Sequence, residues 1–198
     1  DVSFTIERGK IYGFIGENGA GKTTTIRAIT GLTSVAEGSV EISGALNQKG
    51  LEEARKKMGC LVERPILSLN KTAFDNLRMQ QLLFGQTDDT KIAAILERVG
   101  LRDVRNKKVK DFSLGMKQRL GIAAAIMEDP DIIILDEPTN SLDDSGVELV
   151  KDIVTEEKNR GALIIVSCHD KSVLEFLSYE IYTITDGRIT DHIVMKKE

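Results

Sequence analysis

Eight consecutive residues, Gly16–Thr23, match the pattern GxxxxGK[ST] of a phosphate-binding loop. Glycines let successive backbone N–H groups point at phosphate oxygens, and a helix that follows directs its positive end at the same anion. Lys22 can neutralise the β- and γ-phosphates, and the Thr23 hydroxyl can ligate Mg²⁺. The alternative is a structural turn, although every position of the pattern is filled. The candidate nucleotide-binding residues here are Gly16, Asn18, Gly19, Ala20, Gly21, Lys22, Thr23 and Thr24.

An apolar run over residues 132–135 ends in two adjacent carboxylates, Asp136 and Glu137. Four aliphatic residues in a row fit a buried parallel strand, and ligands of open α/β sheets lie beyond the carboxyl ends of such strands. We therefore expect Asp136 to hold Mg²⁺ through its water shell and Glu137 to act as the general base on an attacking water. The alternative is a strand end with two solvated acids.

Residues 112–123 precede that run and carry Ser113 and Gly115 ahead of a helix-like segment. Together with the two motifs above, this segment resembles the signature of the ATP-binding cassette (ABC) ATPases, usually written LSGGQ, and the resemblance covers nearly the whole chain. Ser113 suits a helix N-cap, and Gly115 lets the backbone approach a γ-phosphate closely. Three positions depart from the usual signature: Phe112, Leu114 and Met116, the last of which cannot hydrogen-bond as glutamine would.

The remaining family motifs follow in order along the chain. Residues 139–143 look like the D-loop, and His169 after a strand-like run looks like the switch histidine that contacts the γ-phosphate. Glu63 stands where the family usually has glutamine, so it can offer an oxygen to Mg²⁺ but adds negative charge. The Glu63 change and the Ser-Leu-Gly-Met-Lys signature resemble the ATPases of bacitracin-resistance and lantibiotic-immunity exporters.

The resemblance assigns roles, cofactors and partners. It implies ATP and Mg²⁺ as cofactors, hydrolysis of ATP, a nucleotide-dependent homodimer, and a separate integral membrane permease that exports a peptide antibiotic or related substrate. In such a dimer the signature of one subunit covers the ATP bound by the other. The chain is then cytoplasmic and peripheral on the inner face of the membrane. The implied catalytic residues are Lys22, Glu137 and His169, the signature contacts to nucleotide are Ser113, Gly115 and Met116, and the metal ligands are Thr23, Glu63 and Asp136.

Alternating strand and helix patterns must position these residues. They predict an α/β fold over residues 1–198: a P-loop NTPase core with a mostly parallel sheet, an antiparallel β subdomain, and a helical subdomain inserted at about 66–128. Asp186-Gly187 is a hairpin signal. Strands are predicted at residues 2–6, 11–15, 38–42, 59–62, 131–135, 162–167, 180–185 and 188–192, and helices at residues 22–31, 51–57, 72–84, 89–99, 115–128, 144–159 and 171–177.

Composition is that of an ordinary globular domain, with 41% hydrophobic and 29% charged residues and a net charge of −4. The basic pairs Lys107-Lys108 and Lys196-Lys197 are small, so nucleic acid is not an expected partner. Two cysteines indicate a reducing compartment. No apolar run reaches the length of a membrane helix, and no signal peptide is visible. The aromatic residue that stacks on adenine in the family is expected to precede this chain, together with one further strand.

Two other functional classes fit the sequence less well. A soluble ABC ATPase acting on ribosomes usually carries two cassettes, and one acting on chromosomes carries a long coiled coil between Lys22 and the signature, for which this chain is too short. A scaffold without hydrolysis is disfavoured because Lys22, Asp136, Glu137 and His169 are all present. The loop after Glu63 contains Ile66, Leu67 and Leu69, which either fold back onto the helical subdomain or line a groove for a cytoplasmic helix of the permease.

Overall fold

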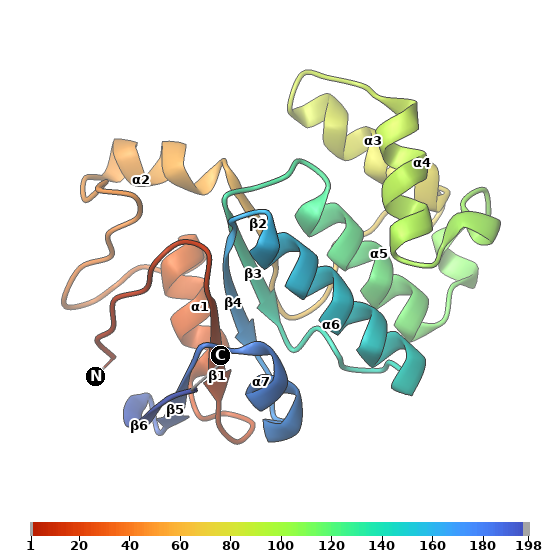
Figure 1. The fold of residues 1–198 in the computed structure, drawn as a ribbon. Coiled ribbons are helices and arrows are strands. Elements are labelled where there is room, and N and C mark those ends of the chain that lie inside the picture. Colours follow the sequence, from red (N-terminus) through yellow and green to blue (C-terminus); the bar gives the residue numbers. More distant parts are fainter. Residues whose placement is uncertain (1, 196–198) are drawn as a thin grey trace.

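The computed structural model describes residues 2–195, which form one six-stranded sheet flanked by helices (Figure 1). The strand order is β2-β3-β4-β1-β5-β6; five strands are parallel and β6 is antiparallel to β5. The strands are β1 (Ile11–Ile15), β2 (Met58–Leu61), β3 (Ile132–Asp136), β4 (Leu163–Ser167), β5 (Glu180–Thr185) and β6 (Arg188–Val194). The helices are α1 (Lys22–Thr30), α2 (Gln48–Arg55), α3 (Ala73–Leu83), α4 (Asp89–Arg98), α5 (Leu114–Ile126), α6 (Asp144–Asn159) and α7 (Lys171–Leu177), with short 3₁₀ turns at Arg102–Val104 and Val109–Asp111.

The mostly parallel α/β fold is confirmed, but two predicted strands are wrong. Residues 38–42 form only an isolated antiparallel bridge between Ile42 and Ala45, and residues 2–6 form no strand. Residues 2–6 do alternate between partly buried and exposed side chains, and the Phe4 ring lies 5.3 Å from that of Phe14. The alternation therefore reflects packing on the sheet face, because a strand also needs a neighbour for its backbone N–H and C=O groups.

Two apolar layers cover opposite faces of the sheet. One contains Ile26 of α1 with Phe14 of β1, and the other contains Leu120 of α5, Val150 of α6 and Val173 of α7. This sandwich holds the parallel strands so that their carboxyl ends meet at one edge. At the end of the sheet, Asp186 and Gly187 both have positive φ, 47° and 70°, so the predicted β5–β6 hairpin turn is confirmed.

The chain between β2 and β3 is helical. Figure 1 shows α5 next to the sheet and α3 and α4 beyond it, and α5 contacts both β2 and the outer helices. Side chains cap each of the three helices at its N-terminus: Thr72 with Asp75 in a capping box on α3, Asp88 on α4 and Ser113 on α5. These caps fix where each helix begins, and Ser113 therefore fills the N-cap position predicted for it.

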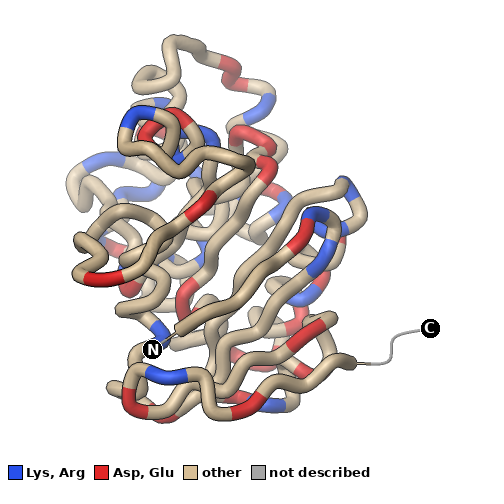
Figure 2. The backbone as a smooth tube through the Cα atoms, turned by 90° about the vertical axis from the view of Figure 1, so that its left-hand side faces the viewer, with Lys and Arg blue, Asp and Glu red and all other residues tan. Residues whose placement is uncertain are grey.

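Positively and negatively charged residues are mixed along the described chain. Lysine, arginine, aspartate and glutamate positions are interspersed along the tube in the view of Figure 2, rather than sorted by sign. The pair Lys196-Lys197 lies outside the described residues. Within residues 2–195, each helix is too short or too polar to cross a membrane.

Two glycines let α5 approach β2 very closely. A Cβ built on Gly59 would lie 1.8 Å from the Ala125 carbonyl oxygen, and one on Gly121 would lie 2.6 Å from Pro65 Cβ. The first obstruction is backbone, which cannot rotate away. This contact ties the helical insertion to the sheet.

We expect Gly59→Ala to lower the free energy of unfolding by about 1–3 kcal/mol, because the added methyl forces α5 away from β2. Denaturant unfolding followed by circular dichroism measures this loss. Cys60→Ala, at the exposed neighbouring position of the same strand, is the control and should change stability little. A Gly59→Ala protein as stable as its Cys60→Ala counterpart would show that the helix is not held this closely.

Candidate functional site

The loop between β1 and α1 surrounds a cleft of about 140 Å³. Gly19 and Gly21 have positive φ, 84° and 110°, which a side chain would strain. Gly21 is the N-cap of α1, and no side chain of the described residues caps the helix there. The first N–H groups of α1 are thus left for a ligand, which fits a phosphate group. The cleft is lined by Glu17, Asn18, Gly19, Gly21, Lys22, Thr23, Thr24 and Glu137.

Two predicted loop residues lie behind this lining. A Cβ on Gly16 would come within 2.3 Å of the Ile184 carbonyl oxygen, so the loop starts against β5. Ala20 is buried, and its carbonyl oxygen accepts a hydrogen bond of 2.8 Å from the N–H of Gly187. These two positions support the shape of the loop against the β5–β6 hairpin.

The Lys22 side chain is only 5% exposed and folds back over its own loop. Its ammonium donates to the carbonyl oxygens of Gly16 at 2.6 Å and Glu17 at 3.3 Å. It also lies 3.4 Å from Oε1 of Glu137. A single positive charge therefore joins the loop to the acidic end of β3.

Asp136 is buried and is contacted by groups from α1, from β4 and from the loop after β2. Its Oδ2 accepts a hydrogen bond of 2.8 Å from the Thr23 hydroxyl of α1, and its Oδ1 accepts one from the Ser167 hydroxyl of β4. The backbone N–H of Glu63 lies 3.4 Å from Oδ2. A hydroxyl and a carboxylate at this point are hard oxygen donors, which fit Mg²⁺.

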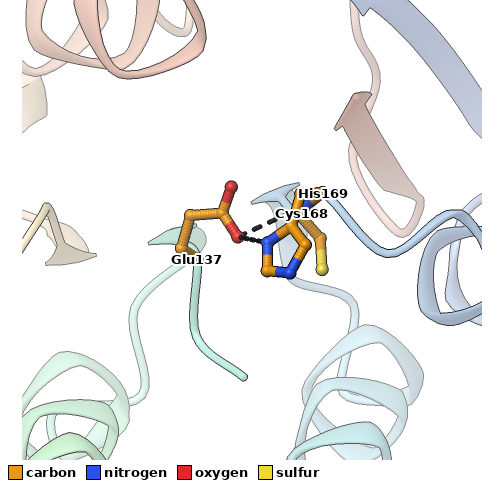
Figure 3. A group of neighbouring side chains, drawn as sticks. All are labelled: Glu137, Cys168 and His169. Atoms are coloured by element: carbon orange, nitrogen blue, oxygen red, sulfur yellow. Dashed lines mark hydrogen bonds and ion pairs between the residues drawn. The ribbon is translucent and has the colours of Figure 1, made fainter. Parts of the chain in front are cut away.

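Glu137 occupies a strained position at the end of β3, with φ of 49°. Its N–H donates to the Ser167 carbonyl and hydroxyl oxygens, both at 3.0 Å. Oε2 lies 2.8 Å from Nδ1 of His169, as Figure 3 shows, and also accepts the His169 backbone N–H at 3.3 Å. Oε1 is buried and has no hydrogen-bond partner among residues 2–195. One oxygen of Glu137 is thus oriented by histidine, and the other makes no hydrogen bond but is paired with the Lys22 ammonium at 3.4 Å beside the cleft.

The carboxylate of Glu63 does not join this cluster. Glu63 has φ of 58°, its side chain is exposed, and its Oε1 pairs with the Arg27 guanidinium at 3.1 Å. Its backbone, rather than its side chain, approaches Asp136. The metal-ligand role given to Glu63 stays a prediction, and it requires the side chain to leave Arg27.

The signature residues also lie apart from the cleft in the described chain. Ser113 accepts a hydrogen bond of 3.2 Å from the N–H of Met116, which itself packs against the core. A Cβ on Gly115 would meet the Ser141 carbonyl oxygen at 2.8 Å, so Gly115 is also needed for packing within this chain. Leu114 is 70% exposed. The start of α5 therefore presents an uncovered apolar side chain to the solvent.

Two residues of the site were missed by sequence reasoning. Ser167 contacts both carboxylate residues, and it lies opposite Asp136 in the β3–β4 register. The sequence pattern that could have identified Ser167 is a polar residue at the end of an apolar strand, next to another strand that ends in an acidic residue. Gln118 is buried on α5 and donates to the carbonyl oxygens of Glu137 at 3.1 Å and Pro138 at 3.3 Å. No sequence pattern marks Gln118.

A second and larger depression of about 720 Å³, the lateral groove, lies along β2 and α5. Ile66 lines it and is fully exposed, whereas Leu67 lines it and also packs against the core. Leu69 is half exposed but does not line it. Leu67 thus packs against the core and Ile66 faces the open groove, while docking of a permease helix there stays a prediction. Cys60 and Phe84 also line this groove.

Comparisons with known proteins agree with this geometry. A family model described as "ABC transporter" matches residues 1–140. The lantibiotic transport ATP-binding protein SrtF of Streptococcus pyogenes is 38% identical over 100% of this chain and 83% of its own length. The bacitracin transport ATP-binding protein BcrA of Bacillus licheniformis is 40% identical over 97% of this chain, which spans only 63% of that relative.

A solved structure shares the fold. The dimeric post-hydrolysis structure of the ATP-binding cassette MJ0796, bound to ADP and Pi, superposes with a TM-score of 0.87 at 25% identity. The match covers 100% of this chain and 90% of that chain.

We expect Lys22→Ala to remove most of the thermal stabilisation by Mg-ATP while leaving the fold intact, because the loop loses its charge. For the unchanged protein, ATP at about 100 times its Kd should contribute about 2.7 kcal/mol. Melting curves with and without Mg-ATP provide the measurement. Lys10→Ala, which removes a lysine paired with Glu7 at the surface, is the matched control. An undiminished shift in Lys22→Ala would place the phosphates elsewhere.

Proposed function

The chain belongs to the ABC transporter family of ATP-binding proteins, and we propose that it powers a bacterial exporter of peptide antibiotics or related substrates. As a member of this family the chain is an ATPase. The residue that carries the proposal is Glu137. One of its oxygens is held by His169, and the other, buried beside the cleft, makes no hydrogen bond and lies 3.4 Å from the Lys22 ammonium. A carboxylate that is oriented at the cleft and keeps an oxygen without a hydrogen bond can take a proton from water.

We assign the steps to residues as follows. The N–H groups of the loop and the Lys22 ammonium bind the phosphates and offset their charge. Glu137 orients the attacking water and accepts its proton, and His169 holds the carboxylate in place. Thr23 and Asp136 would hold Mg²⁺, which supplies further positive charge to the phosphates when bound. Lys22 starts this process hydrogen-bonded to Gly16 and Glu17, so phosphate binding must compete with those two bonds.

We propose that the working unit is a dimer with nucleotide at the interface. The start of α5 lies outside the cleft of its own chain and exposes Leu114, as a surface that contacts another subunit would. The similar cassette MJ0796 is dimeric in its nucleotide-bound structure. Ser113, Gly115 and Met116 would then approach the nucleotide of the second subunit.

We propose that the lateral groove receives a short amphipathic helix of an integral membrane permease. Ile66 and Phe84 in the groove are 102% and 51% exposed, and Leu82 and Leu83, the two residues before Phe84 in the chain, are exposed as well. Exposed apolar side chains gathered at a groove favour a partner, and helix-in-groove docking uses such anchors. The chain would accordingly be cytoplasmic and bound to the inner face of the membrane. SrtF and BcrA, named for lantibiotic and bacitracin transport, support the substrate class.

Glu137→Gln should keep ATP binding and lose about 10²–10⁴ in hydrolysis rate, because the amide cannot accept the proton of the water. In the presence of ATP, this variant should then accumulate as a stable dimer, which light scattering detects. Phosphate release at saturating Mg-ATP measures the rate. Turnover at the unchanged rate would remove Glu137 from its assigned role.

The same variant allows a control for the dimer geometry. Adding Ser113→Arg to Glu137→Gln should abolish the ATP-dependent dimer by steric bulk while monomer ATP binding persists. Adding Ser145→Ala, an exposed position at the start of α6, should leave the dimer intact. Loss of ATP affinity in the Ser113 monomer would contradict contact with the second subunit's nucleotide.

Ile66→Asp should reduce copurification with the membrane subunit, because it puts a charge where an apolar contact is proposed. Its full exposure means that folding and ATP hydrolysis by the isolated chain should be unchanged. The two proteins are coexpressed, extracted in detergent and quantified after affinity capture. Leu46→Asp, an equally drastic change at an exposed site outside the groove, is the control. Equal recovery of Ile66→Asp and Leu46→Asp would exclude this groove.

A further inference from the structure

Three different metal-ligating groups meet at the carboxyl ends of β3 and β4. A carboxylate oxygen of Glu137, the Cys168 sulfur and a ring nitrogen of His169 all lie within 4.8 Å of one another. Figure 3 shows the three side chains together, with the histidine ring beside the Glu137 carboxylate. Glu137 and His169 have assigned roles in hydrolysis, but Cys168 has none. Hydrolysis does not explain why a thiol lies next to them.

We propose that these residues form an inhibitory site for a thiophilic divalent cation, with Zn²⁺ as the ion that fits best. Zinc binds sulfur, imidazole nitrogen and carboxylate oxygen together, whereas Mg²⁺ prefers oxygen alone. Three protein ligands leave a fourth position for water, as in open zinc sites. The site is therefore distinct in chemistry from the Thr23–Asp136 pair that suits Mg²⁺.

The present geometry is close to what such an ion needs. Ligands of tetrahedral zinc, at bond lengths of about 2.0–2.3 Å, lie about 3.3–3.6 Å apart. Glu137 Oε2 and His169 Nδ1 are now closer than this, at 2.8 Å, while the widest separation in the cluster is within 4.8 Å. Small side-chain rotations would lengthen the distance between Glu137 and His169 and shorten the widest separation, so that all three groups could reach one ion. His169 is 61% exposed, which gives the ion a path from solvent.

Cys168 has only weak contacts to give up. Its sulfur lies 3.5 Å from the Thr139 hydroxyl and 3.3 Å from the N–H of Asp170. Zinc binding would replace the S–H bond of Cys168 with a Zn–S bond and release the proton to solvent, with no change of oxidation state. The alternative is a cysteine that only fills space in the core.

The expected effect is selective. A bound ion would occupy the Glu137 and His169 atoms that act on water, so hydrolysis stops. Lys22 and Thr23 lie outside the cluster, so the nucleotide stays bound. Zinc inhibition should thus leave an ATP-loaded, inactive protein, unlike inhibition by loss of the fold. This regulation goes beyond the proposed function and does not depend on the transported substrate.

The first test measures zinc binding without nucleotide. Untagged full-length protein in a phosphine reductant competes with a chromophoric chelator for Zn²⁺. We expect one ion per chain, and we expect Cys168→Ala to weaken binding by at least the roughly 10–100-fold that loss of a supporting group costs a metal site. Cys60→Ala, which removes the other cysteine on β2, is the matched control and should bind like the unchanged protein. Equal affinity in Cys168→Ala and Cys60→Ala would overturn the proposal.

The second test identifies the ligands and the consequence. Co²⁺ in place of zinc should give a sulfur-to-cobalt charge-transfer band in the unchanged protein and in Cys60→Ala but not in the nearly isosteric Cys168→Ser. With free Zn²⁺ buffered, each variant's ATPase rate is compared with its own zinc-free rate. Only the two proteins that keep Cys168 should be inhibited, with their Mg-ATP melting shift retained. Absence of the sulfur band, or equal inhibition of Cys168→Ser, would overturn the site. The cobalt spectrum decides this even if the chain proves not to hydrolyse ATP.

Discussion

Asp136 and Ser167 face each other across β3 and β4, and a slip of one residue in that pairing would turn both side chains to the opposite face of the sheet. The positions of several polar groups in the site depend on this register. Ser167 holds Asp136 through its hydroxyl and the N–H of Glu137 through its hydroxyl and carbonyl oxygens. Thr23 completes the cluster from α1. The apolar runs of β3 and β4, buried on both faces, make the slip costly, so the same packing that stabilises the sheet also aligns the polar groups at its edge.

A continuous set of contacts runs from this cluster to the signature. The Glu63 backbone approaches Asp136, and Pro65 two residues later packs against Gly121 of α5. The same helix begins at Ser113 and sends Gln118 back to the carbonyl oxygens of Glu137 and Pro138. The segment between these points lines the lateral groove. A displacement of the loop at Glu63 therefore has close-packed routes to both the groove and the start of α5, which suits a protein that joins nucleotide chemistry to a partner.

Most of the fold could be predicted from the sequence because local rules and tertiary packing agree. Complete motifs, helix caps and aliphatic runs locate α1, α5, β3 and β4 within a residue or two. Residues 2–6 show where the rules fail: their alternation reports packing of Phe4 on aromatic rings, while strand formation depends on a neighbour that a pattern cannot supply. The site shows the same limit. The types of Asp136 and Glu137 imply their chemistry, but the Glu63 carboxylate faces Arg27, a residue far away in the chain. Such an ion pair produces no periodic pattern in the sequence from which it could be predicted.

Glu137 combines an unfavourable backbone conformation with a buried oxygen that has no hydrogen bond. A left-handed backbone costs a residue with a side chain about 1–2 kcal/mol, and glycine would adopt it freely. Stability and activity therefore place conflicting demands on this position. A chain selected only for thermal stability would lose the glutamate here. Laboratory selection for thermal stability should therefore replace Glu137 early. A natural cassette with another residue here should be more stable and should not hydrolyse ATP. The backbone strain thus lies at the residue that is proposed to act on water.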